Sequence, residues 1–151
     1  MTLRLSTKLR DNLAGTTGFA STFANGVIEI YTGTQPATAD AAVTGTLLGT
    51  VTLNSGAFTP GTATNGLTFA SASGGSVSKS GVWSFNGIAV GTAGWFRLKG
   101  NAVDAGGIST TLPRLDGSVA VSGADMNMSN ISVTIGSPHT VDTFVWTQPA
   151  Q

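Results

Sequence analysis

The chain has 151 residues, the size of one common domain, and it lacks cysteine, which excludes disulfide bonds, cysteine-based zinc sites and thiol nucleophiles. Only 9% of the residues are Asp, Glu, Lys or Arg, against roughly 25% in a typical soluble domain, and the seven basic and seven acidic residues cancel. This balance argues against a nucleic-acid-binding surface, which needs clustered positive charge, and favours a chain that packs into an assembly.

The first predicted element is a short amphipathic helix at the N-terminus. Leu5, Leu9 and Leu13 recur every four residues, so a helix places them on one face. A short helix needs a surface to pack on. We expect this one to cover the sheet of its own chain, and the alternative is that the three leucines anchor the protein to a partner.

The ends of this helix and the domain division follow from the same region. Ser6 or Thr2 supplies a hydroxyl for the N-cap, and Gly15 suits the end of the helix. Residues 1–15 are therefore predicted to form an N-terminal helix or arm, and residues 16–151 a single β-sandwich domain.

Beyond Gly15 the pattern becomes that of β-strands. Residues 26–31 give the clearest signal, because they are rich in β-branched and aromatic side chains. Further strands are predicted at residues 47–53, 57–59, 67–70, 77–85, 94–99, 118–121, 130–135 and 140–147. Short strands separated by Gly, Asn, Asp and Pro predict an all-β fold, either a β-sandwich or a jelly-roll-like barrel, with one short N-terminal helix.

The last predicted strand alternates clearly. Alternation places Val141, Thr143 and Val145 on one face and Asp142, Phe144 and Trp146 on the other. The aromatic face is either core or contact surface. Trp146 is the candidate for an exposed ring that stacks on a sugar, although aromatic residues supply most of a small β core.

No group of residues nominates an active site or a metal site. The single histidine, His139, has Asp142 three residues on, but no Gly-x-Ser-x-Gly nucleophile turn accompanies it. Asp104, Asp116 and Asp125 are too far apart in sequence for a calcium loop. We therefore expect no enzymatic activity, no cofactor and no metal.

Residues 110–118 combine Pro113, an Arg–Asp pair and a glycine. The favoured interpretation is a turn before a strand, in which Arg114 and Asp116 pair locally with little effect on stability. The alternative is an exposed contact loop, which makes Arg114 and Asp116 candidate interaction residues.

Four segments carry a resemblance to a known family. They are IEIYTGTQPATADAA at 28–42, TGTLL at 44–48, GTAGWFR at 91–97 and SGADMN at 122–127. Together they resemble a family of small β-rich proteins of tailed bacteriophages and prophages. The resemblance extends over nearly the whole chain, and it implies a structural role in the virion without any active site.

Within that role we expect a capsid decoration, or cement, protein that binds the capsid exterior and forms homo-oligomers. The alternatives are a tail, collar or head–tail junction protein, and a tail-associated adhesin that binds a glycan. Lys8, Arg10 and Asp11 interrupt any apolar run of a secretory signal, and no segment is apolar enough to span a membrane. The expected location is the virion, after synthesis in the bacterial cytoplasm, without nucleic-acid or membrane partners.

Overall fold

The computed structural model describes residues 3–150, in which two helices and eleven strands form. The helices are α1 (Thr7–Ala14) and α2 (Phe19–Thr22). The strands are β1 (Arg4–Leu5), β2 (Val27–Thr32), β3 (Leu47–Leu53), β4 (Thr68–Phe69), β5 (Ser76–Ser80), β6 (Trp83–Asn86), β7 (Gly91–Lys99), β8 (Arg114–Ala120), β9 (Met126–Met128), β10 (Ser132–Val133) and β11 (Pro138–Thr147).

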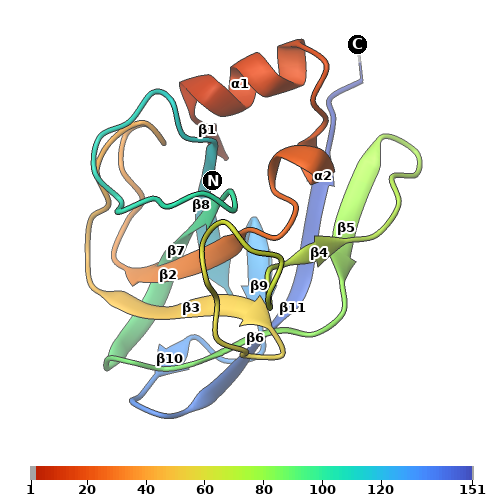
Figure 1. Cartoon of the computed structure of the whole chain (residues 1–151). Coiled ribbons are helices and arrows are strands. Elements are labelled where there is room, and N and C mark those ends of the chain that lie inside the picture. Colours follow the sequence, from red (N-terminus) through yellow and green to blue (C-terminus); the bar gives the residue numbers. More distant parts are fainter. Residues whose placement is uncertain (1–2, 151) are drawn as a thin grey trace.

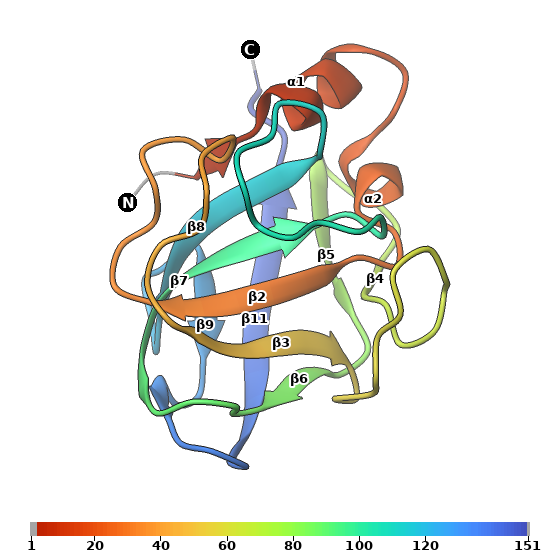
Figure 2. The same ribbon diagram turned by 60° about the vertical axis from the view of Figure 1, so that its left-hand side comes forward.

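Within this part of the chain, seven strands close into a barrel (Figures 1 and 2). Antiparallel neighbours run in the order β8, β7, β2, β3, β6 and β11. Strand β9 closes the ring, since it pairs with β11 on one side and in parallel with β8 on the other. The predicted all-β fold with a short N-terminal helix is confirmed. The prediction of a sandwich or jelly roll is not confirmed, because closure by β9 joins the strands into one ring instead of two facing sheets.

Several predicted strands have different ends in the structure. Residues 57–59 lie in the loop 54–66 between β3 and β4. The strand predicted at 77–85 divides into β5 and β6, because Gly81 turns the chain there with a φ of 76° that other residues rarely adopt. Of the strand predicted at 130–135, only β10 pairs, and it pairs with β7.

Helix α1 closes one end of the barrel (Figure 1). Ser6 is its N-cap and accepts a hydrogen bond from the Leu9 N–H, and Gly15 is its C-cap. Leu9 is fully buried in the barrel core, and Leu5 and Leu13 pack partly buried against the same core. Leu5 itself lies in β1, one residue before the cap. The helix therefore covers the barrel of its own chain.

A β-bulge in β11 changes which side chains enter the core. The register with β9 shifts between Val141 and Thr143, so that two successive residues face outward. Val141, Phe144 and Trp146 are consequently all buried, whereas Thr143 and Val145 are exposed. The prediction that Val141, Thr143 and Val145 share a face was wrong for this reason.

Two loops cover the outer face of β2, β7 and β8, and we call them the loop cover. They are residues 33–46, between β2 and β3, and residues 100–113, between β7 and β8. Figure 2 shows the loop 100–113, in teal, in front of β7 and β8. Both faces of these strands are buried as a result: Phe96 and Leu98 enter the core, while the alternating Arg97 and Lys99 are buried under the loops.

Candidate functional site

A layer of paired charges lies between the barrel wall and the loop cover. Three salt bridges form it, with N–O distances of 2.6–2.7 Å, and we call their six residues the charged layer. The pairs are Arg97–Asp116, Lys99–Glu29 and Arg114–Asp104. Six of the fourteen charged residues of the chain are thus paired with one another: four are buried, and Lys99 and Glu29 keep 7% and 15% of their side chains exposed.

The charged layer holds the loop cover in place. Arg97 binds both carboxylate oxygens of Asp116 and donates from Nη1 to the carbonyl of Ala41 in the loop 33–46, at 3.0 Å. Lys99 donates to Glu29 and to the carbonyl of Asp104, while Arg114 binds both carboxylate oxygens of Asp104. Each loop is therefore fixed to the barrel by charge-assisted hydrogen bonds, which are stronger than neutral ones.

Burial and these contacts shift the pKa values of Asp104 and Asp116 in the layer and of the neighbouring Tyr31. Burial alone would raise the pKa of Asp104, but hydrogen bonds from Arg114 and from the Gly106 N–H, together with nearby positive charge, outweigh it and lower that pKa below 3.8. Burial raises the pKa of Asp116 despite the opposing effect of Arg97. Burial, followed by the hydrogen bond to Glu29, raises the pKa of Tyr31. The ionisable groups of the layer are thus engaged with one another and with the backbone of the loops.

Arg114 and Asp116 do not pair with each other as predicted. They lie two residues apart on the same outer face of β8, and each is paired with a residue on another element. Both are buried, at 1% and 0% exposure, so neither lies on an exposed contact loop. Their structural role is to hold β7 and the loop 100–113 against β8.

Trp146 is buried as well. It is 7% exposed and stacks on Phe19 of α2, with 4.7 Å between ring centroids and 4° between planes. Phe19 in turn contacts Phe23, Phe69 and Phe144. The ring therefore joins the core and offers no free face on which a sugar can stack.

His139 lies beside a serine hydroxyl, and Asp142, three residues on, is not among its hydrogen-bond partners. Its Nε2 lies 2.8 Å from the Ser137 hydroxyl, and its Nδ1 lies 3.1 Å from the carbonyl of Asn130. Ser137 also accepts from the Thr134 N–H and donates to the Thr134 carbonyl. The Ser137 hydroxyl is thus engaged both as acceptor and as donor within the turn that precedes β11.

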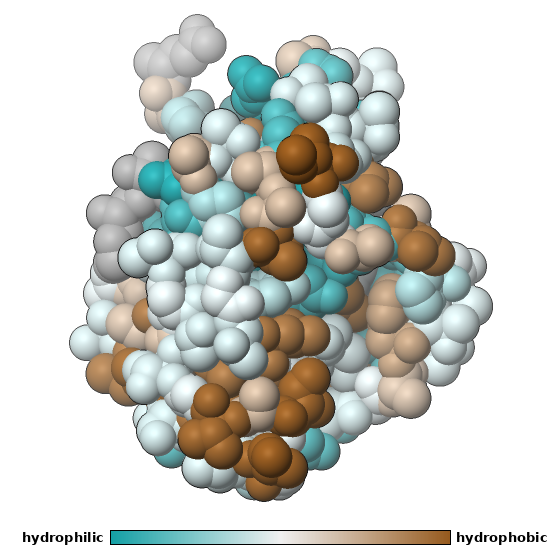
Figure 3. All heavy atoms as spheres, turned by 90° about the vertical axis from the view of Figure 1, so that its left-hand side faces the viewer, coloured by the Kyte–Doolittle hydropathy of each residue, from teal (hydrophilic) through white to brown (hydrophobic). Residues whose placement is uncertain are grey.

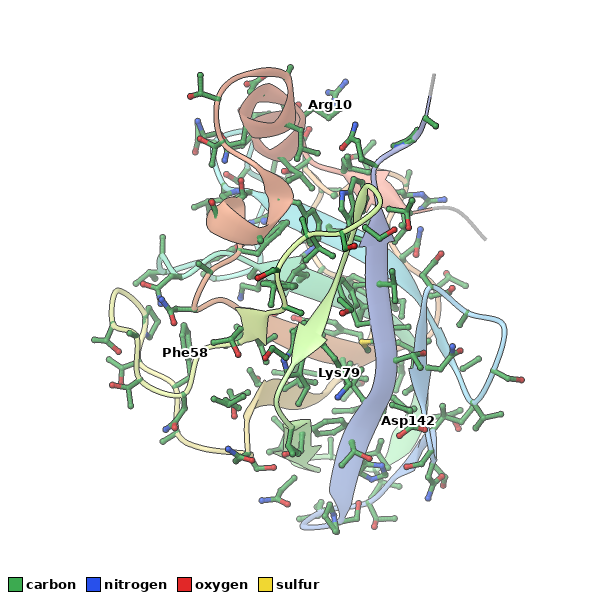
Figure 4. All side chains as sticks on the ribbon, turned by 90° about the vertical axis from the view of Figure 1, so that its right-hand side faces the viewer. Arg10, Phe58, Lys79 and Asp142 are labelled. Atoms are coloured by element: carbon green, nitrogen blue, oxygen red, sulfur yellow. The ribbon has the colours of Figure 1, made fainter. Side chains whose placement is uncertain are left out.

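A groove opens on the outer face of β2 and β3, beside the charged layer. It has a volume of about 550 Å³, within the roughly 300–1,000 Å³ of ligand pockets. One wall is Ala57, Phe58 and Pro60 of the loop 54–66, and the other is Ala102 and Val103 of the loop 100–113. Figure 4 shows Phe58 on its loop. The walls are apolar and come from segments distant in sequence.

The floor of this groove is polar. Thr50 and Thr52 come from β3, and Glu29 and Lys99 come from the charged layer. Asn86 and Ile88 line its end, beside β6. Three charged residues line the groove, and each is in an ion pair: Glu29 with Lys99, and Asp104 with the buried Arg114 behind it. The charges at the groove are therefore balanced.

Exposed apolar side chains gather at the end of the barrel opposite α1. Ile88, Val90 and Ile135 are 59%, 70% and 73% exposed, and we call them the apolar tip. Two hydrogen bonds join their turns, from the Gly136 N–H to Gly87 O at 2.7 Å and from the Gly87 N–H to Ser137 O at 2.9 Å. Figure 3 shows apolar residues concentrated at this lower end of the molecule.

Charged side chains are sparse elsewhere. Figure 4 shows Arg10 on α1 at one end of the molecule, and Lys79 and Asp142 on the neighbouring strands β5 and β11. Among residues 3–150, no cluster of three or more His, Asp or Glu side chains has the arrangement of a metal site. No helix in the same range has the length and hydrophobicity that crossing a membrane requires.

Sequence reasoning missed both the groove and the apolar tip. Phe58, Glu29 and Lys99 are far apart in the sequence. They line one groove only because the fold brings the loop 54–66, β2 and β7 together. The apolar tip could have been predicted from one feature of the sequence. Residues 80–96 and 126–141, which supply its two turns, contain no Asp, Glu, Lys or Arg.

Comparison of the chain with protein-family models, with curated proteins and with solved structures found no match. The site is therefore interpreted from its own geometry.

Proposed function

We propose that this chain is a non-enzymatic structural component of a tailed-bacteriophage particle, and within that class a capsid decoration protein. The observation that carries the proposal is the distribution of charge. The charged layer is internal, and the apolar tip is exposed in a region without charged side chains. Such a surface suits permanent contact with other proteins better than life as a free monomer.

The apolar tip is the proposed contact surface. Burying an apolar side chain of this size contributes roughly 1.5–3 kcal/mol, and the tip offers three of them on two turns that hydrogen bonds join. An uncharged tip also has no repulsion to overcome at a seam between subunits, where interface cores are apolar and depleted of charge. The choice of a virion as the assembly depends on the sequence-based expectation from the four segments at 28–42, 44–48, 91–97 and 122–127.

The proposal that the chain is not an enzyme depends on the state of its candidate catalytic groups. The carboxylates of Asp104 and Asp116 are both engaged by arginines. The Ser137 hydroxyl is engaged by its own turn. A hydrolase needs a nucleophile, a base and a carboxylate around one accessible centre. In this chain the candidate groups are instead engaged with other partners.

The second candidate is a tail, collar or head–tail junction protein, including an adhesin that binds a glycan. The groove favours this candidate specifically, because it is a concave neutral site with polar groups at its floor. Both candidates predict that the protein is a stable part of the particle, and they differ in its copy number.

Co-sedimentation with particles that lack the protein tests the contact surface. The triple variant Ile88→Ser, Val90→Ser, Ile135→Ser should lose binding at least about tenfold, because three apolar contacts are removed. The matched control is Ile108→Ser with Val145→Ser, which removes exposed apolar residues outside the tip and should bind normally. Equal binding by the triple variant and the control would contradict the proposed surface. Sedimentation velocity of the free proteins shows whether the tip also joins copies of the chain.

A further inference from the structure

We infer that the groove on β2 and β3 binds a neutral oligosaccharide. The inference concerns the isolated protein, so it holds or fails independently of where the chain sits in a particle. It assigns a ligand class to a site of about 550 Å³ whose walls are apolar and whose floor is hydrogen-bonding.

The floor is fixed in place and keeps unused hydrogen-bonding capacity. Lys99 Nζ donates to Glu29 Oε1 at 2.7 Å and to Asp104 O, which leaves one of its three protons free. Glu29 Oε2 accepts from the Tyr31 hydroxyl at 2.6 Å, and each carboxylate oxygen retains a further acceptor site. Because these groups are held by one another, a ligand would not have to order them.

Two further polar groups lie along the groove. Within residues 3–150, the Thr50 hydroxyl and the Asn86 amide have no hydrogen-bond partner, and both side chains line the site. The groove thus offers a hydroxyl, an amide, a carboxylate and an ammonium group. A polyhydroxylated molecule matches this mixture of donors and acceptors.

The shape and the charge of the groove restrict the class of ligand that it can bind. Its floor is the face of a sheet, whose backbone groups are already paired between β2 and β3, so a peptide cannot bind there by adding a strand. Its charged groups are all neutralised in the ion pairs Lys99–Glu29 and Arg114–Asp104, so no unpaired charge attracts a strongly anionic or cationic ligand. The Phe58 ring and Pro60 offer one apolar wall, and Val103 lies on the other. A sugar ring has an apolar C–H face for such a wall and hydroxyl groups for the floor.

Titration of the ¹⁵N-labelled full chain tests the inference by NMR. The probes are maltotriose, cellotriose and triacetylchitotriose, each added to millimolar concentration. The expected result is saturable shifts, with at least one probe, confined to amides of residues 50–60, 86–88 and 99–105. Phe58→Ala and Thr50→Val should each weaken that binding about fivefold or more, as the loss of one good contact does.

The matched control is Ile108→Ala, which changes an exposed residue of the loop 100–113 that does not line the groove. It should bind the probe with unchanged affinity. The absence of saturable shifts with all three sugars would overturn the inference, as would binding that Phe58→Ala and Thr50→Val leave unchanged. Phe58 and Thr50 are both partly exposed, so these variants are expected to fold, and their amide spectra report whether they do.

Discussion

The guanidinium of Arg114 binds the carboxylate of Asp104, with 2.6 Å between Nη2 and Oδ1, and thereby closes the loop 100–113 at its base. Lys99 adds a hydrogen bond to the carbonyl of the same aspartate. This loop forms one wall of the groove through Val103 and half of the loop cover. An ion pair at the base of the loop thus shapes the candidate binding site, and its Asp104 also lines the groove.

Replacing Asp104 tests this relationship. Asp104→Asn leaves the buried Arg114 without its charge partner, and breaking a buried ion pair in this way costs about 3 kcal/mol of unfolding free energy. Urea denaturation measures the loss. The control is Asp142→Asn on β11, an exposed residue whose change should alter stability by less than about 0.5 kcal/mol. Equal stability of both variants would show that the ion pair does not hold the loop.

The pH dependence of the same variant follows from the pKa of Asp104. Because that pKa is lowered in the folded protein, the unfolded chain takes up the proton first as the pH falls. The stabilisation by Asp104 is therefore complete above its ordinary pKa of 3.8 and is lost as the pH falls through the lower folded value. The difference in unfolding free energy between the wild type and Asp104→Asn should narrow over this range.

Asp116, whose pKa is raised by burial, is present in both proteins, and its contribution to the difference largely cancels. A gap between the two proteins that stays constant from pH 6 to pH 3 would contradict the lowered pKa of Asp104.

Trp146→Ala separates a core tryptophan from a binding one. Truncating a buried tryptophan typically costs about 3–5 kcal/mol, and here the change also removes the stacking on Phe19. Thermal unfolding should show a large fall in Tm, while Trp146→Phe should recover part of it. If Trp146→Ala left Tm unchanged and abolished binding to cells, the residue would be a contact residue after all.

Leu9 distinguishes a covering helix from an anchoring one. Leu9→Ala should lower the unfolding free energy by about 3 kcal/mol, because the side chain is fully buried in the barrel core. The exposed Arg10 of the same helix gives the control Arg10→Ala, which should change stability little. Deleting the residues before Gly15 should accordingly destabilise the barrel. A truncated protein with wild-type stability and weaker particle binding would support the anchor instead.

The sequence was informative where local pattern determines structure. β-Branched alternation located β2 and β3, and the leucine spacing with Ser6 and Gly15 located α1 and its caps. These features depend on residues within one or two turns of each other. The closure of the barrel depended on β9, whose three residues Met126–Met128 are too few to carry a strand signal.

The pairing of charges was not predictable, for a topological reason. Lys99 and Glu29 are seventy residues apart, and Arg97 meets Asp116 only because β7 and β8 are antiparallel neighbours in that register. The bulge at Val141 likewise depends on β9 and not on the sequence of β11. The sequence favoured local pairing of Arg114 with Asp116. In the structure the register of β7 and β8 places Arg97 opposite Asp116, and Arg114 pairs with Asp104.

The copy number of the protein in purified particles tests the central claim most directly. If the chain is the virion protein that we propose, particles from a culture that produces it would be purified by density gradient, and the protein would be quantified by mass spectrometry against the major capsid protein. A decoration protein should be present at the same order as the capsid protein, whereas a few per cent would place it in the tail or neck. Its absence from particles that are otherwise complete would contradict the proposal that it is a structural virion protein.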